Sequence, residues 1–144
     1  MRYVVDTNII MSAMLSPSGR VADVFFNRLI EAELICPHFL VIELFDKKER
    51  IQKYSKLNNI AVSDLYYLLL KRVSFINEEL ISTESLKIAY DLVVEKDIDD
   101  LVFVALAVHA NATLWTGDLK LLKHLRKKGF TKACTTTELY QETS

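Results

Sequence analysis

Cysteine is scarce in this sequence, which has only Cys36 and Cys134 among its 144 residues. Neither cysteine belongs to a C-x-x-C pair, and no pair of histidines lies near either one in the sequence. Structural zinc sites are built from such closely spaced Cys and His ligands. The sequence therefore argues against a zinc site, and we expect both cysteines to be reduced thiols in the core.

Long apolar segments are also missing. The longest uncharged run, residues 101–116, contains a histidine, an asparagine and two threonines, so it is too short and too polar to cross a bilayer. No apolar segment of the signal-peptide type follows Met1 and Arg2. We therefore expect a cytoplasmic protein without a membrane partner.

A large net charge is absent, because the formal charge at pH 7 is −1. The charges are nevertheless unevenly spread: seven of the 18 Lys and Arg residues lie within 47–72 and six within 120–132, whereas eight acids lie within 78–100. An acidic centre with basic flanks suits a metal site served by phosphate-binding arms. Ordinary solvated helix faces give the same pattern, so both interpretations stay open.

The order of apolar and amphipathic segments predicts one α/β domain spanning residues 1–144. Short apolar runs predict strands near residues 3–5, 34–36, 74–76, 112–118 and 133–135. Helical patterns predict helices near 7–15, 21–31, 39–54, 65–73, 82–94, 101–108 and 119–128, with a last short helix beginning near 137. Since crossovers between parallel strands are right-handed, the second strand should lie beside the first and point the same way.

Two aspartates directly follow predicted strands. Asp6 comes one residue after the first strand, and Asp118 ends the fourth strand segment. The carboxyl ends of parallel strands border the ligand crevice of an open α/β sheet, so both carboxylates are placed where chemistry is usually done. The alternative for Asp6 is a simple cap of the helix that starts at Thr7.

Glu43 interrupts an apolar helix start and is a further candidate. An ionised carboxylate in apolar surroundings is costly unless it is paired, hydrogen-bonded or bound to a metal. The helix follows the second strand, so its first turn should lie near the crevice that Asp6 borders. A simple ion pair between Glu43 and Lys47, one turn on, is the alternative.

Three acids, Asp97, Asp99 and Asp100, stand directly before a helix that is apolar on all sides. The helix dipole stabilises each acid by only about 0.3–1 kcal/mol, and carboxylates that share a site raise one another's pKa. A divalent cation would remove this conflict. A plain helix cap, with Asp97 and Asp100 on the first turn, explains one or two of these acids.

These motifs resemble the PIN domain family over almost the whole chain. The opening Val-Val-Asp-Thr-Asn-Ile-Ile at residues 4–10, the Asp97-x-x-Asp100 pair before an Ala-rich helix, and Thr-Gly-Asp at 116–118 followed by Leu121 and Leu122 match its pattern in the right order. One departure is Ile98, where relatives often carry proline. The resemblance implies a three-layer α/β/α sandwich around a central, mostly parallel sheet of four to five strands.

The resemblance also implies a site and an activity. Asp6, Glu43, Asp100 and Asp118 match the acids with which the family binds one or two Mg²⁺ or Mn²⁺ ions, while Asn8, Thr116 and Asp97 match supporting positions. The expected function is metal-dependent hydrolysis of RNA, since many relatives are stand-alone ribonucleases or toxins of toxin-antitoxin pairs. The implied partners are RNA, a cognate antitoxin and a second copy of the chain.

Two rival functions stand beside the expected ribonuclease activity. A non-catalytic RNA-binding module would be expected to have lost some of the four acids, and none is lost. A phosphotransferase acting through an aspartyl phosphate on Asp6 would need a second acid beside or two residues after it, where Thr7 and Asn8 stand. The RNA target, the number of metal ions and the toxin role stay open.

Overall fold

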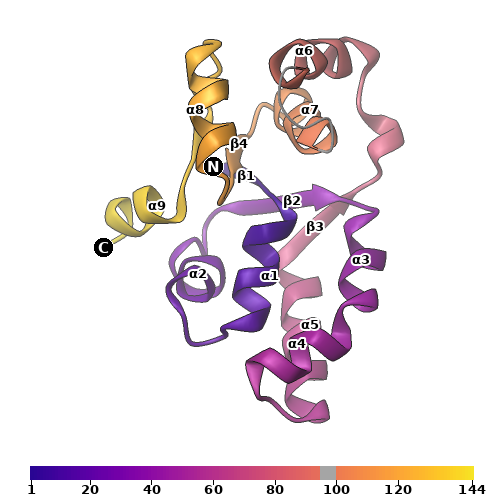
Figure 1. The fold of residues 1–144 in the computed structure, drawn as a ribbon, viewed down its shortest axis with the longest axis vertical. Helices are drawn as coiled ribbons and strands as arrows, with labels where there is room; N and C mark the ends of the chain where they lie inside the picture. The colour runs from indigo at the N-terminus through magenta and orange to yellow at the C-terminus, as the bar shows by residue number, and fades with distance from the viewer. Residues whose placement is uncertain (95–99) are drawn as a thin grey trace.

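The fold is built on a five-stranded sheet in which every neighbouring pair of strands is parallel (Figure 1). The computed structural model describes residues 1–94 and 100–144. The strand order is β3-β2-β1-β4-β5, with the strands β1 Arg2–Val5, β2 Glu33–Pro37, β3 Val73–Ile76, β4 Thr113–Trp115 and β5 Ala133–Cys134. The parallel sheet and the neighbouring positions of the first two strands are confirmed.

Alternating side chains of the strands enter two separate cores. Tyr3 and Val5 pack into one core, whereas Val4, which lies between them on β1, packs into the other. The first core is covered by α1 Thr7–Leu15, α2 Arg20–Asp23, the π-helix η1 Val24–Arg28, α3 Leu40–Asp46, α4 Lys48–Ser55, α5 Asn59–Arg72 and α9 Thr136–Glu142. The second is covered by α6 Thr83–Val93, α7 Leu101–Ala110 and α8 Leu119–Lys127. The three-layer α/β/α sandwich is thereby confirmed (Figure 1).

The single helix predicted for residues 39–54 is two helices. The chain turns at Lys47 (φ −98°, ψ 10°), which separates α3 from α4. Leu44 before the break and Ile51 after it are both buried in the same core, and α4 packs against α1. The change of direction allows both side chains to reach that core. No Gly or Pro in residues 39–54 indicates this break in the sequence.

Helix α5 begins six residues earlier than predicted. The side chain of Asn58 accepts a hydrogen bond of 2.8 Å from the amide of Ala61 and so caps the helix, whereas Ser63 and Asp64 lie inside it. The buried positions are Val62, Leu65, Tyr66 and Leu69, which follow the helical spacing from the first turn onward.

The helix predicted for 21–31 is short and ends in a π-helical turn. The amide of Leu29 donates to the carbonyl of Val24, five residues earlier, at 3.2 Å. The guanidinium of Arg72, at the end of α5, donates to the carbonyls of Phe25 and Ala32 at 3.1 Å each and also to that of Leu29. One side chain therefore satisfies three carbonyls where this irregular segment ends.

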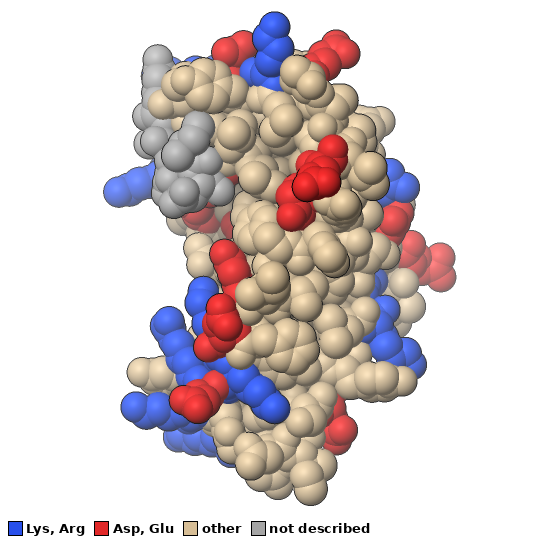
Figure 2. Space-filling view, turned by 90° about the vertical axis from the view of Figure 1, so that its right-hand side faces the viewer, with Lys and Arg blue, Asp and Glu red and all other residues tan. Residues whose placement is uncertain are grey.

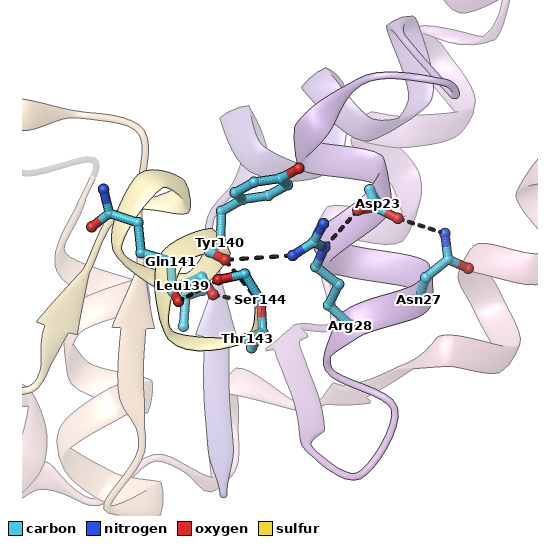
Figure 3. A network of polar contacts seen from close by, with 8 residues as sticks. All are labelled: Asp23, Asn27, Arg28, Leu139, Tyr140, Gln141, Thr143 and Ser144. Atoms are coloured by element: carbon cyan, nitrogen blue, oxygen red, sulfur yellow. Dashed lines mark hydrogen bonds and ion pairs between the residues drawn. The ribbon is translucent and has the colours of Figure 1, made fainter.

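The C-terminal helix α9 is attached to α2 and η1 by a polar network (Figure 3). The ring of Tyr140 lies beneath two guanidinium groups, 4.5 Å from that of Arg20 and 3.8 Å from that of Arg28. Arg28 also forms a 2.6 Å ion pair with Asp23, whose second oxygen accepts a 3.0 Å hydrogen bond from Asn27. These contacts hold the C-terminal helix α9 against α2 and η1 in the first helical layer.

Both cysteines are free thiols, as predicted. Cys36 is buried on β2, and its thiol donates a 3.2 Å hydrogen bond to the carbonyl of Val5. Cys134 is half-buried on β5, where burial, together with the nearby carboxylates of Glu138 and Glu142, raises its pKa to about 12. Neither thiol is therefore ionised at neutral pH.

Taken one at a time, the helices of residues 1–94 and 100–144 are too short or too polar to cross a membrane. The segments Thr7–Leu15 and Arg20–Arg28, bent by 106° to each other, meet the length and composition criteria only when taken together.

Candidate active site

Asp6 lies at the carboxyl end of β1, where the chain turns into α1. Its amide donates to the carbonyl of Trp115 at 3.2 Å, which extends the pairing of β1 with β4 by one residue. Its Oδ1 accepts a 2.9 Å hydrogen bond from the amide of Ile9, so Asp6 caps α1. The capping alternative is thus realised, and it also fixes the carboxylate at the edge of the sheet.

Asp118 lies three residues after the end of β4 and caps α8. Its Oδ1 accepts hydrogen bonds from the amides of Lys120 and Leu121 at 3.0 and 3.1 Å. Thr116, which is fully buried, connects the two aspartates. Its Oγ1 accepts a 3.0 Å hydrogen bond from the amide of Asp118, and its hydroxyl hydrogen-bonds the carboxylate of Asp6.

The environment of Asp6 disfavours a negative charge. Burial is the main cause that raises its pKa, and the nearby charge of Asp118 adds to the increase. Hydrogen bonds from Thr116, Ile9 and Gly117 oppose this effect without cancelling it. Asp6 is half-buried, and Asp118, which is exposed, lies near it. Two neighbouring carboxylates are a donor set that a divalent cation neutralises, because Mg²⁺ and Mn²⁺ prefer carboxylate oxygens. These residues therefore fit the predicted metal.

Glu43 is half-buried on α3, next to the fully buried Leu44. Within the described residues it forms no ion pair with Lys47, so the alternative of a simple surface pair is not realised. Another acid, Glu78, contacts the start of α3: its Oε2 accepts a 3.3 Å hydrogen bond from the amide of Phe39.

Glu78 was missed by the sequence analysis. It follows β3 within two residues, as Asp6 follows β1, and this position after a strand was the signal that could have found it. Its contact with Phe39 gives it a role in positioning α3, and hence Glu43.

Asp100 occupies the position before α7 but makes no capping hydrogen bond to that helix. The ring of Phe39 contacts that of Phe103 on the first turn of α7, with centroids 6.0 Å apart and an angle of 74° between the planes. One aromatic contact therefore joins the residue before α3 to the first turn of α7. Asp97 lies outside the described residues.

The remaining supporting residue, Asn8, is exposed on the first turn of α1, and its side chain makes no hydrogen bond within the described part of the chain. The structure thus connects Asp6 and Asp118 through Thr116, and one ring contact, between Phe39 and Phe103, joins the segments that carry Glu43 and Asp100. Across residues 1–94 and 100–144, no three Asp, Glu, His or Cys side chains lie close enough to hold one ion together. The four-acid metal site stays a prediction.

The carboxyl edge of the sheet faces the viewer in Figure 2, because β2 points toward that side in Figure 1. Asp and Glu side chains border an indentation at the left of this face, and Lys and Arg side chains gather below it. Acidic and basic groups thus lie next to each other on the face where strands β1 and β4 end.

The PIN domain family model matches residues 4–141. The chain belongs to the PIN domain family. Among solved structures, the PIN domain described here is similar to a chain of VapBC2 from Rickettsia felis, crystallised with a DNA fragment from the promoter of that system. The TM-score is 0.61 at 20% identity, over 94% of this chain and 97% of that chain, and this likeness shows a shared fold. None of the curated proteins matches the sequence.

Proposed function

We propose that this PIN domain is a metal-dependent endoribonuclease that hydrolyses phosphodiester bonds in cytoplasmic RNA. The observation that carries the proposal is the pair of aspartates held at the ends of adjacent strands and connected by the buried hydroxyl of Thr116. Burial, to which the nearby charge of Asp118 adds, disfavours the ionised form of Asp6, and a bound cation would offset this cost. Membership of the PIN domain family supports the same activity.

Four acids are proposed to hold one or two Mg²⁺ or Mn²⁺ ions: Asp6, Glu43, Asp100 and Asp118. Asp118 uses Oδ1 for the two amides of α8, so its Oδ2 is the oxygen available to a ligand. A bound divalent cation would supply an activated water and neutralise charge on the scissile phosphate. Thr116 fixes the separation of Asp6 and Asp118, and Asn8 and Asp97 are proposed to support the site from its rim.

The decisive experiment compares the wild type with Asp6→Asn on a panel of single-stranded and hairpin RNAs, with Mg²⁺, with Mn²⁺ and with EDTA. We expect cleavage that needs the metal and is lost in Asp6→Asn. Asp64→Asn, which removes an exposed carboxylate on α5, is the matched control and should cut like the wild type. RNA binding without cleavage in either metal would instead indicate a non-catalytic RNA-binding module.

We further propose that the chain acts as the toxin of a toxin-antitoxin pair. Its sequence resembles that branch of the family, and its fold is shared with a chain of VapBC2. Expression in bacteria should arrest growth, and the toxin role predicts a neighbouring gene for a small protein whose co-expression restores growth and yields a stable complex. Growth that continues despite soluble, RNA-cleaving protein would contradict this role.

A homodimer is the oligomeric state proposed for the isolated chain. One copy has a mass of 16.5 kDa, so light scattering on the purified protein should give twice that value. Large apolar side chains on α3 and α5 are consistent with a covered surface, since Ile42 is 69% and Leu68 is 53% exposed in the single copy. A monomeric mass at micromolar concentration would contradict the dimer.

A further inference from the structure

Helix α4 carries an exposed tyrosine flanked by two cations. The guanidinium of Arg50 lies 5.9 Å and the ammonium of Lys53 lies 5.6 Å from the centre of the Tyr54 ring. Tyr54 remains 59% exposed in spite of these neighbours. The spacing of the three residues places them on one side of the helix. Together they form a cationic surface with an aromatic ring at its centre, which we call the Tyr54 platform.

A neighbouring face of α4 packs this platform onto the domain. Ile51 is fully buried in the core that α1 also enters, and α4 packs directly against α1. Only Lys47 separates α4 from α3, which carries Glu43. From the rise of the two helices and the length of the linking residues, the Cα atoms of Glu43 and Tyr54 are at most about 20 Å apart. The platform is therefore within a few nucleotides of the candidate active site.

Most of the charged residues around the platform are positively charged. The segment 47–56 contains five Lys or Arg residues and a single acid, Glu49. In the part of the chain that the structure describes, neither Arg50 nor Lys53 forms an ion pair. Figure 2 shows Lys and Arg gathered in the lower part of the site face, at the height of α4 in Figure 1. Unpaired cations beside an exposed ring suit a polyanion that also carries planar bases.

We propose that the Tyr54 platform binds a single-stranded segment of the RNA substrate, with one base stacked on Tyr54 and the flanking phosphates contacted by Arg50 and Lys53. This inference rests on the proposed ribonuclease function. Bases of a duplex are stacked on one another and cannot reach the ring, whereas unpaired bases can. The platform therefore selects single-stranded or looped RNA and positions its backbone toward the aspartate pair.

The test measures the affinity of a fluorescent single-stranded 12-mer of adenylate by anisotropy, in Mg²⁺ and at several salt concentrations. All variants carry Asp6→Asn so that the probe stays intact. Tyr54→Ala should weaken binding by at least about fivefold, the smallest loss expected for one base stacked on an aromatic ring. Tyr54→Phe, which keeps the ring, should bind like the parent.

Charge is tested separately from stacking. The double variant Arg50→Gln with Lys53→Gln should lower the slope of log affinity against log salt by about 1.4, the value for two phosphate contacts on a single strand. The matched controls are Tyr90→Ala and Lys87→Gln on α6, an exposed tyrosine and lysine on the opposite layer of the sandwich. Both controls should leave affinity and salt slope unchanged.

Several results would overturn the platform. These are the absence of RNA binding in the parent, equal affinity of the parent and Tyr54→Ala, or an equal loss in Tyr90→Ala. Cleavage by the otherwise wild-type enzyme separates this inference from the proposed function. If Tyr54→Ala cuts with an unchanged KM, the platform is wrong and the nuclease stands. If RNA binds through Tyr54 but is never cut, the platform stands and the nuclease is wrong.

Discussion

The backbone amide of Asp118 donates a 3.0 Å hydrogen bond to the hydroxyl oxygen of Thr116. The same hydroxyl hydrogen-bonds the carboxylate of Asp6. One buried oxygen atom therefore fixes the positions of two acids that come from opposite ends of the chain. The separation of the two acids depends on this hydroxyl as much as on the sheet that carries them.

Replacement of Thr116 by valine should disrupt the aspartate pair. Valine has nearly the same shape but leaves the Asp118 amide and the Asp6 carboxylate without their shared partner, which costs about 1–3 kcal/mol of folding free energy. We expect kcat for RNA cleavage to fall as well, because the two carboxylates lose the side chain that positions them; a loss of about 1.4 kcal/mol in transition-state stabilisation would appear as a tenfold decrease. Thr116→Ser, which keeps the hydroxyl, should retain most of the activity, and equal loss in both variants would contradict this role.

Asp6→Asn should stabilise the metal-free protein. Burial and the charge of Asp118 raise the pKa of Asp6, so its ionised form is less favourable in the folded protein than in the unfolded chain. Asparagine removes this charge and keeps an oxygen that can accept from the Ile9 amide. In EDTA at neutral pH, we expect a Tm a few degrees above that of the wild type. A lower Tm would instead show that the ionised carboxylate of Asp6 stabilises the folded protein.

Metal binding should appear as a thermal shift that depends on Asp6. A cation that binds only the folded protein stabilises it by about 2.7 kcal/mol at 100 times its dissociation constant. Titration with Mn²⁺ should therefore raise the Tm of the wild type and leave that of Asp6→Asn almost unchanged. The control Asp64→Asn should respond like the wild type, and an identical response of all three proteins would contradict the metal site.

Arg72→Lys should destabilise the fold although it conserves the charge. The planar guanidinium donates to the carbonyls of Phe25, Leu29 and Ala32 together, and a lysine ammonium cannot match this geometry. Loss of one or two of these charged hydrogen bonds predicts a decrease of about 2–4 kcal/mol in the free energy of unfolding. Urea denaturation measures it, with Lys71→Gln on the exposed face of α5 as the control that should stay within about 0.5 kcal/mol.

Protonation of Glu138 should account for part of the folding free energy that the protein loses in acid. The amide of Thr135 and the guanidinium of Arg126 both donate to its carboxylate and lower its pKa. Because the pKa is lower in the folded protein than in the unfolded chain, this stability is present above the ordinary Glu pKa and is lost as the pH falls through the lowered value. Glu138→Gln should cost about 0.2–1 kcal/mol at pH 7, and this cost should shrink as the pH falls through the lowered pKa of Glu138, as measured by Tm. A pH-independent cost would contradict an ionic cause.

The parallel sheet was predictable from the sequence because its strands are apolar runs with turn residues after them. The start of α1, with Asp6 as its cap, was predictable for a similar local reason, since the cap bonds an amide within the first turn of its own helix. The break at Lys47 was not predictable, because it depends on Ile51 meeting a core built from distant segments. The π-helical turn is likewise held by Arg72, which lies more than 40 residues away.

In the candidate site, too, some features could be predicted from the sequence and others could not. The positions of Asp6 and Asp118 after adjacent strands follow from the topology that the sequence predicts. The role of Thr116 as the shared hydrogen-bond partner requires the register in which Val5 pairs with Trp115, and only the structure provides it. Glu78 could not be predicted in the same way, because the third strand is only weakly apolar and so the end of that strand is poorly defined in the sequence.

The central place of β1 in the sheet also affects how the protein is made. Tyr3 pairs with Thr113, so the first strand stays without its β4 neighbour until most of the chain has been translated. At about 5 to 20 residues per second, Asp6 leads Asp118 by roughly 6 to 22 seconds of synthesis. An unfinished chain on the ribosome thus lacks half of its aspartate pair. Under the proposed function, a chain that has not yet reached Asp118 would therefore lack the complete pair of carboxylates.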